Sequence, residues 1–284
     1  MTTIAEHYSR QSAFQAVHQA LDRIAAQIAE GHLKPLSLQQ TAALDQFHVG
    51  GLKANIALAE RLPLNGESHI LDAGCGLGGP ARHLASHFGA RVTGVDLTDE
   101  FCLLARKLNA LTATSRVEIL CADVLDTGLA GSSFDAVWTQ HVAMNIVNRQ
   151  QLYREFARLL KSGGLLAIHD VVKGTGEPIS YPLPWSSDGK HSHVISRTEL
   201  FSLLTEAGFS LLHAEDVTGQ SIAALDKAIA LPSSMATDMS NTALPNLGDL
   251  LGPTFLTARI NLRRQLDSGS LGLLQTVWQK GSSG

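Results

Sequence analysis

Long apolar runs and an excess of one charge are both missing from this 284-residue sequence. No apolar stretch approaches the roughly 20 residues that a membrane-spanning helix needs, and the opening MTTIAEHYSR lacks the apolar core of a secretory signal. Lysine and arginine total 22 against 26 aspartates and glutamates, the formal net charge is -4, and the basic residues are scattered. We therefore expect neither a nucleic acid nor a membrane as a partner.

Cysteine is also scarce, and the three cysteines, Cys75, Cys102 and Cys121, show no CxxC spacing. A sparse, odd count fits a reducing compartment, so we expect a cytoplasmic protein without a disulfide framework. The histidines of DGKHSHV lie near Asp188 but lack a third spaced ligand. This stretch predicts a solvated loop, and no metal site is expected.

Short strand-like runs alternate with helix-like ones from residue 70 to about 216, which predicts a parallel sheet covered by helices. Residues 1–60 have the three-to-four spacing of amphipathic helices. We expect the following organisation: an N-terminal helical segment over the site (1–60), a core (61–218), a helical cap (219–268), a final core strand (269–280) and a flexible tail (281–284).

The stretch ILDAGCGLGGPARHL, which begins at Ile70, reads as a strand, a glycine-rich turn and the start of a helix. Gly74 and Gly76 allow a sharp turn and a close approach of the backbone to a ligand. In parallel sheets such turns lie at the carboxyl ends of strands, where ligands bind. Glycine spacing alone does not separate a dinucleotide site from an S-adenosylmethionine site.

Three carboxylates at successive strand ends narrow the choice of ligand. Asp72 can face an ammonium group. Asp96 can accept hydrogen bonds from both hydroxyls of a ribose, and Asp123 can accept one from the amino group of an adenine. Val124 and Leu97 can pack on the two faces of that ring. Each aspartate singly could cap a helix, but together with the glycine turn they indicate a ligand with an amino-acid tail, a ribose and an adenine.

The motifs LDAGCGLGGPARHLA, VTGVDLT, ADVLD, FDAVWTQHVAMNI and LLKSGGLLAIHDVV resemble those of class I S-adenosylmethionine-dependent methyltransferases over residues 65–215. DQFHVGG, TQHVAMNI and YPLPW are similar to the sarcosine/dimethylglycine N-methyltransferase-like (methyltransferase type 11) subfamily. The resemblance implies an α/β, doubly wound, Rossmann-like sheet of seven strands, mostly parallel with the last antiparallel. The cap resembles nothing that identifies an acceptor.

The resemblance also implies roles for individual residues. The methionine tail of the cofactor S-adenosyl-L-methionine would be held by Asp72 and the turn Gly74–Cys75–Gly76, and its ribose by Asp96 and Leu97. Asp123 and Val124 would hold the adenine, and Gln140 and His141 would lie beside the sulfonium. Residues that would close the cofactor from the N-terminal side are Gln46, His48 and Gly50.

His141 is the candidate catalytic residue, either as a base or as a group that orients the acceptor by hydrogen bonding. The residues expected at the acceptor are His48, Asn145, Tyr181 and Trp185; the aromatic pair could contact a cationic methylamine. Trp138, in mid-strand, is expected in the core.

We therefore expect a methyltransferase that acts on a small molecule, with an amine nitrogen as the favoured acceptor and a homodimer left open. O-, S- or C-methylation is the alternative within this class. Two hypotheses from other classes of protein remain. One is an NAD-dependent oxidoreductase, which Asp72 and Asp123 disfavour, and the other is a non-catalytic protein that binds an adenosyl ligand.

Overall fold

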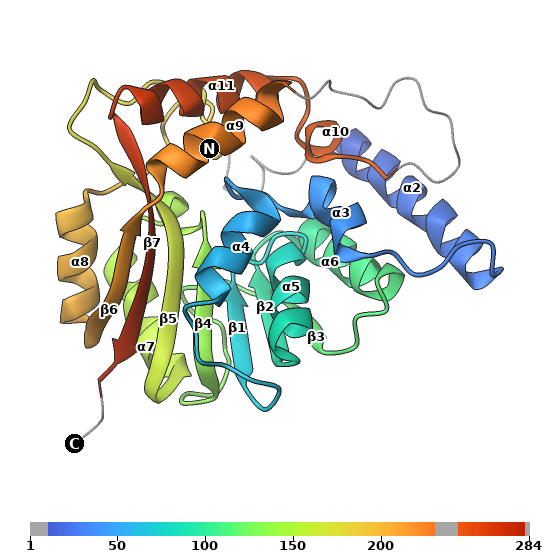
Figure 1. Ribbon diagram of the computed structural model, residues 1–284, viewed down its shortest axis with the longest axis horizontal. Coiled ribbons are helices and arrows are strands. Elements are labelled where there is room, and N and C mark those ends of the chain that lie inside the picture. Colours follow the sequence, from blue (N-terminus) through green and yellow to red (C-terminus); the bar gives the residue numbers. More distant parts are fainter. Residues whose placement is uncertain (1–10, 231–243, 282–284) are drawn as a thin grey trace.

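The computed structural model describes residues 11–230 and 244–281, and its centre is one seven-stranded sheet (Figure 1). Every strand falls on one of the apolar runs predicted from the sequence. The strands are β1 (His69–Ala73), β2 (Arg91–Asp96), β3 (Val117–Cys121), β4 (Phe134–Gln140), β5 (Leu160–Lys173), β6 (Phe209–Asp216) and β7 (Leu271–Lys280).

The strand order is β3-β2-β1-β4-β5-β7-β6. The pairs β1–β2, β2–β3, β1–β4 and β4–β5 are parallel, whereas β7 is antiparallel to both β5 and β6. The chain runs outward from β1 to β3 and then returns to β4 on the other side of β1, so the order reverses between β1 and β4. This confirms the predicted fold class, and it locates the switch point at which such sheets bind ligands.

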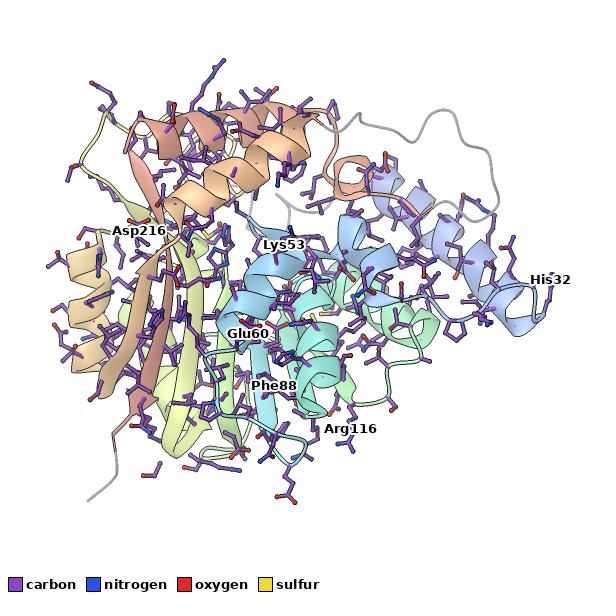
Figure 2. The ribbon with its side chains drawn as sticks, viewed as in Figure 1. His32, Lys53, Glu60, Phe88, Arg116 and Asp216 are labelled. Atoms are coloured by element: carbon purple, nitrogen blue, oxygen red, sulfur yellow. The ribbon has the colours of Figure 1, made fainter. Side chains whose placement is uncertain are left out.

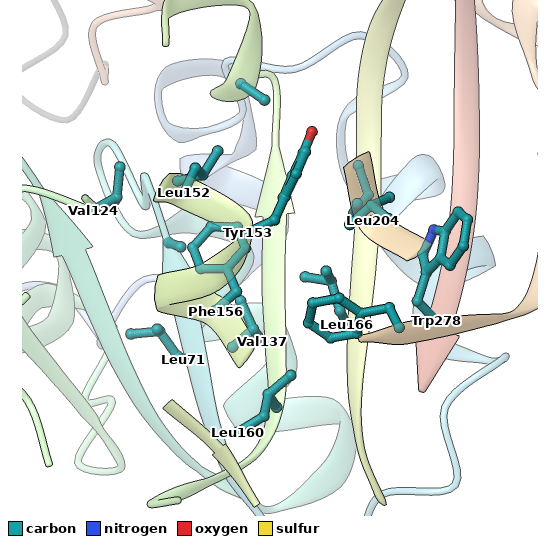
Figure 3. Packing of buried hydrophobic residues seen from close by; sticks show 14 of the residues in the cluster. Leu71, Val124, Val137, Leu152, Tyr153, Phe156, Leu160, Leu166, Leu204 and Trp278 are labelled. Carbon is teal, nitrogen blue, oxygen red and sulfur yellow. The ribbon is translucent and has the colours of Figure 1, made fainter. Parts of the chain in front are cut away.

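Helices cover both faces of the sheet because neighbouring strand residues point to opposite sides. Ile70 packs against α4 (Gly51–Ala59) and α5 (Gly79–Phe88). Leu71 belongs to the other face, which α7 (Arg149–Leu159) and α8 (Arg197–Glu206) cover. Figure 3 shows Leu152 and Phe156 of α7 beside Leu71 and Val137. Trp138 is fully buried, as expected of a core residue.

Among the remaining helices, the one at 99–111 packs on β2 and β3, and the others lie beside or across the sheet (Figure 1). They are α2 (Gln11–Ala29), α3 (Leu38–Asp45), α6 (Asp99–Leu111), the short helix η1 (Ala143–Asn145), α9 (Thr218–Ala230), α10 (Leu247–Leu251) and α11 (Thr254–Asp267). The apolar stripe of α2 packs on α6 and α10, while α9 and α11 pack together over β7. Figure 2 locates His32, after α2, on the opposite side of the molecule from Asp216 at the end of β6.

The predicted division of the chain is not tested by the fold alone and stays a proposal. Helices α9, α10 and α11 occupy the predicted cap, but its central part, 231–243, lies outside the described residues, as does most of the predicted tail. In the described ranges, no helix combines the length and the apolar character needed to cross a membrane.

Candidate functional site

The glycine turn after β1 is tightly closed against neighbouring strands. Gly74 and Gly76 have φ values of 77° and 52°, in the left-handed region that favours glycine. The amides of Gly74 and Cys75 both donate to the carbonyl oxygen of Val95, at 2.8 and 2.9 Å. A Cβ on Gly74 would overlap the Val142 side chain. The turn therefore needs glycine at this position for two reasons, its backbone conformation and the space left beside Val142.

Asp96, the last residue of β2, connects this turn to the next one. Its carboxylate accepts hydrogen bonds from the amides of Gly76 and Thr98, both at 2.9 Å. Asp123 lies two residues beyond β3, is exposed, and accepts a hydrogen bond from the Leu125 amide at 2.9 Å. These two carboxylates therefore organise the loops on which they lie, and each oxygen can accept further hydrogen bonds from a ligand.

Asp72 differs from both, because one of its carboxylate oxygens, Oδ2, is buried without any hydrogen-bond partner. The residue is 2% exposed. Burial, together with the nearby carboxylate of Asp96, raises the pKa of Asp72 to about 7. A buried carboxyl oxygen without a partner is costly, so this atom is well suited to receive a cationic group from a ligand.

Three histidine rings meet on the other side of the strand ends. The ring centroids of His141 and His169 lie 5.1 Å apart, and His48 lies 6.3 Å from His141 and 5.8 Å from His169. His48 donates from Nε2 to the carbonyl oxygen of Gly51 at 3.0 Å. The His141 backbone amide donates to the His169 carbonyl at 2.9 Å, and His141 has a φ of 53°.

Burial is the main reason why all three imidazoles are neutral at pH 7. It lowers the pKa of His48 to about 4 and that of His141 to about 3, and it lowers the pKa of His169 as well. The ring atoms Nε2 of His141 and Nε2 of His169 have no hydrogen-bond partner. Nowhere in the described part of the chain are three or more His, Cys, Asp or Glu side chains grouped so as to hold a metal ion.

One cavity joins the carboxylates to the histidines and contains most of the site residues predicted from the sequence. Those that line it are His48, Asp72, Gly74, Cys75, Gly76, Asp96, Leu97, Asp123, Val124, Gln140, His141, Asn145 and Trp185. Their roles there remain proposals. The cavity lies at the carboxyl ends of β1, β2 and β4, next to the switch point of the sheet.

Gln46 and Tyr181 do not line this cavity. Gln46 donates to Asp45 Oδ1 at 3.0 Å and accepts from Asn55 Nδ2 at 2.8 Å, so its amide connects the end of α3 to α4. Tyr181 lines a separate cavity, and its ring lies against Gly189. The Gln46 prediction came from the family resemblance and the Tyr181 prediction from its aromatic ring, and neither signal determines which way a loop side chain points.

Sequence reasoning missed several residues of the cavity wall: Asp45, Phe47, Pro80, Thr98, Phe101, Val142, Met144, Ile146, Pro184, Leu251 and Phe255. Phe47 lies within the DQFHVGG motif, and its position between two candidates was a usable signal. Leu251 and Phe255 carried no such signal in the sequence, because α10 and the start of α11 reach the site through tertiary packing on α2 and α3.

A buried ion pair fixes the N-terminal wall of the cavity to the glycine turn. Arg82 on α5 donates to Asp45 Oδ2 at 2.9 Å and to the Leu77 carbonyl at 2.6 Å, and both charged side chains are almost fully buried. Breaking such a pair from one side leaves an uncompensated charge in the protein interior. The Asp45–Arg82 pair therefore holds the segment that carries Phe47 and His48 in place.

The residues present fit an adenosyl ligand with an amino-acid tail. The unpartnered Asp72 oxygen can receive the ammonium, and Gly74 and Gly76 of the turn line the same cavity. Leu97, 48% exposed, lies at the cavity beside Val124, so an aromatic ring can be covered there. The cavity thus has carboxylates, which accept hydrogen bonds, at one end and neutral imidazoles at the other.

Residues 71–168 match the family model described as a methyltransferase domain. A relative, the methyltransferase GfsG of Streptomyces halstedii, is 31% identical over 186 residues, covering 63% of this chain and 66% of that protein. Other curated relatives are named as phosphoethanolamine N-methyltransferases or O-methyltransferases. The chain spans 35% to 66% of the length of the first curated relatives it matches.

Solved structures share the fold. Phosphoethanolamine N-methyltransferase 2 of Haemonchus contortus, in complex with S-adenosyl-L-methionine, aligns with a TM-score of 0.69 at 21% identity, covering 84% of this chain and 54% of that one. A Galdieria sulphuraria protein assigned as a sarcosine dimethylglycine methyltransferase aligns with a TM-score of 0.67 at 18% identity, covering 84% and 93%. Residues 71–168 of this chain therefore match a methyltransferase domain.

Proposed function

We propose that this chain transfers a methyl group from S-adenosyl-L-methionine to a small-molecule acceptor. The observation that carries the proposal is the unpartnered, buried Oδ2 atom of Asp72 beside the glycine turn, in a cavity that extends to His141. The sulfonium of the bound cofactor supplies an electrophilic methyl carbon. The protein's contribution is then largely placement and exclusion of water, which can be worth effective molarities of about 10⁵ M or more.

The residues divide the binding work among successive strand ends. Asp72 receives the ammonium of the methionine tail, and Asp96, already held by two amides, accepts hydrogen bonds from the ribose hydroxyls. Asp123 accepts a hydrogen bond from the adenine amino group, while Val124 and Leu97 cover the ring. Gln140, His48 and Asn145 remain for the reacting end of the cavity.

His141 is the group proposed to act on the acceptor. It lines the cavity directly after β4 and is neutral at pH 7, because burial lowers its pKa to about 3. A neutral imidazole can accept a proton or a hydrogen bond, whereas an imidazolium can only donate. Gln140, whose Nε2 lies 3.4 Å from His169 Nδ1, holds the neighbouring ring in position.

The alternatives from other classes fit this cavity less well. A nicotinamide cofactor carries no ammonium group for the unpartnered oxygen of Asp72. A protein that only binds an adenosyl ligand has no need for the buried histidines His48 and His169 behind His141. We also propose that the protein is located in the cytoplasm, because its three free cysteines fit a reducing compartment.

The proposal predicts binding of S-adenosylhomocysteine and no binding of NAD, measured by titration calorimetry. Asp96→Ala removes a charged acceptor, so we expect the affinity for S-adenosylhomocysteine to fall about 10-fold or more, the equivalent of about 1.5 to 3 kcal/mol. Glu118→Gln is the matched control, because Glu118 is an exposed carboxylate on the neighbouring strand β3.

Thermal unfolding separates a lost ligand contact from a collapsed loop, since Asp96 also accepts the amides of Gly76 and Thr98. Tight binding of NAD, or an Asp96→Ala protein that keeps full affinity, would contradict the site assignment.

A further inference from the structure

Much of the cavity wall consists of apolar side chains from separate elements. Met144 follows β4, Trp185 lies in the long loop after β5, and Leu251 and Phe255 come from α10 and α11. Met144 and Trp185 are each 2% exposed and belong to the hydrophobic cluster beneath α9 and α11. A molecule bound here replaces water against apolar surface, which favours an apolar ligand.

An anionic group would find no counterion in this wall. Among the cavity-lining residues of the described ranges there is no lysine or arginine. The arginines behind the wall already have contacts. Arg82 contacts Asp45, Leu77 and Asn109, Arg149 contacts the His193 carbonyl and the Tyr153 hydroxyl, and the Arg259 guanidinium lies 5.6 Å from the centre of the Phe255 ring. Burying an unpaired carboxylate or phosphate costs far more free energy than burying a neutral group.

A second cation, besides the sulfonium of the cofactor, is disfavoured by the same burial that keeps the histidines neutral and by repulsion from that sulfonium. His48 and His169 are 6% and 1% exposed, and desolvation is the first cause that lowers the pKa of each ring. The carboxylates of the cavity do not offset this at the histidine end. Asp45 pairs with Arg82, and under the proposed function Asp72, Asp96 and Asp123 face the cofactor.

The same end does offer hydrogen bonds to one neutral polar group. Gln140 and Asn145 are 7% and 9% exposed, and the oxygens Gln140 Oε1 and Asn145 Oδ1 are buried without hydrogen-bond partners. Two amide oxygens that lack donors, beside neutral imidazoles, match a group that can donate a hydrogen bond. A hydroxyl can donate one such hydrogen bond and carries no charge.

We propose that the methyl acceptor is an uncharged, mainly apolar molecule whose hydroxyl group donates its one hydrogen bond to His141, beside Gln140 and Asn145. This inference rests on the proposed function, and it replaces the amine nitrogen favoured by the sequence. Forming the new C–O bond breaks the S–C bond, whose electron pair stays on sulfur, and the hydroxyl proton passes to His141. The proton leaves as the oxygen gains positive charge, so a weakly basic imidazole suffices.

The test compares three naphthalene compounds, one neutral, one anionic and one cationic. The probes are 2-naphthol, 6-hydroxy-2-naphthoate and 2-naphthylmethylamine, each titrated by calorimetry into the protein saturated with S-adenosylhomocysteine, and each assayed for methyl transfer from labelled S-adenosylmethionine. We expect 2-naphthol to bind at least about 10-fold more tightly than either charged compound, the equivalent of about 1.4 kcal/mol. Sarcosine and phosphoethanolamine should be neither bound nor methylated.

A paired substitution tests the charge argument within the protein. Leu251→Lys adds a cation to the half-buried rim of the cavity, so it should improve binding of 6-hydroxy-2-naphthoate about 10-fold or more. Leu256→Lys is the control, because Leu256 is 40% exposed on the adjacent helix α11 and does not line the cavity. Leu256→Lys should retain the parent's affinity for S-adenosylhomocysteine, and the naphthalene titrations of both variants are made with this ligand saturating.

The outcomes separate the two proposals. Failure of S-adenosylhomocysteine to bind contradicts the proposed function itself. If it binds but sarcosine, phosphoethanolamine or a charged naphthalene is the better ligand, or if 2-naphthol does not bind, the neutral acceptor is wrong while the methyltransferase proposal stands. If Leu251→Lys and Leu256→Lys improved binding of 6-hydroxy-2-naphthoate equally, the absence of cations from the cavity wall would not be what excludes the anion.

Discussion

The carboxyl group of Asp72 gives the cofactor site a pH dependence near neutrality. Its pKa is raised to about 7 in the ligand-free protein, chiefly by burial, so the group is largely protonated below that pH. A cationic ligand needs the carboxylate. We therefore expect the affinity for S-adenosylhomocysteine to fall as the pH drops below 7, by up to about tenfold per pH unit, with proton release on binding at neutral pH.

Calorimetry in buffers of different ionisation enthalpy measures this proton release, and Asp72→Asn should abolish it while weakening binding. Glu118→Gln again provides the control, since this exposed side chain lies outside the cavity. An affinity that is constant between pH 6 and pH 8 would show that Asp72 does not receive the ammonium.

His141 has a second distinguishing property, its positive φ of 53°. Asparagine adopts this left-handed conformation more readily than alanine, so His141→Asn tests the imidazole with little backbone strain. If His141 takes the acceptor proton, kcat should fall about 10²-fold or more in both His141→Asn and His141→Ala. If it only orients the acceptor, the asparagine variant should retain much of the rate.

The low-pH limb of kcat/KM adds an independent readout. Because the pKa of His141 is lowered to about 3, its titration should not produce a limb near pH 6.5 in the free enzyme. A limb near pH 7 should instead follow Asp72 and persist in His141→Asn. Full activity in both His141 variants would move attention to Gln140, Asn145 and His48.

At the scale of elements, the cavity is closed by segments that are distant in sequence. The loop between α3 and α4 supplies Phe47 and His48, and α10 and α11 supply Leu251 and Phe255. α10 contacts both α2 and α3. These segments therefore form one wall opposite the strand ends, and the ligand would lie between the two.

This arrangement predicts slower hydrogen exchange in that wall when S-adenosylhomocysteine is added. Amides of 46–51 and 247–258 should gain protection, because a bound ligand favours the closed wall and excludes water. Amides of β6, which is at the far edge of the sheet, should not change. Equal exchange of 46–51 and 247–258 with and without ligand would make them a static surface rather than a closing cover.

At the scale of the whole molecule, the cavity lies where three hydrophobic clusters meet. Val124 and Val142 belong to the cluster on the α7 face, Phe47 and Leu251 to the one around α2 and α10, and Met144 to the one beneath α9 and α11. Each cluster is closed by packing of its own. Opening any wall of the site therefore requires repacking a cluster.

The sequence by itself determined the sheet and one side of the site. Apolar runs of strand length separated by helical spacing fixed the seven strands, and the glycines of the first turn, with Asp72, Asp96 and Asp123, marked the carboxyl ends of three of them. These signals are local. Backbone conformation, periodicity and the ends of strands are properties of a few neighbouring residues.

Only the tertiary structure decided the other side. His169 is an ordinary strand residue in the sequence, and it joins His48 and His141 because β4 and β5 pair with Gln140 opposite His169. Phe255 reaches the cavity because α10 packs onto α2 and α3, more than 200 residues earlier, and α11 packs against α10. Gln46 and Tyr181 turned away for the complementary reason: side-chain direction in a loop depends on non-local partners, which no local pattern encodes.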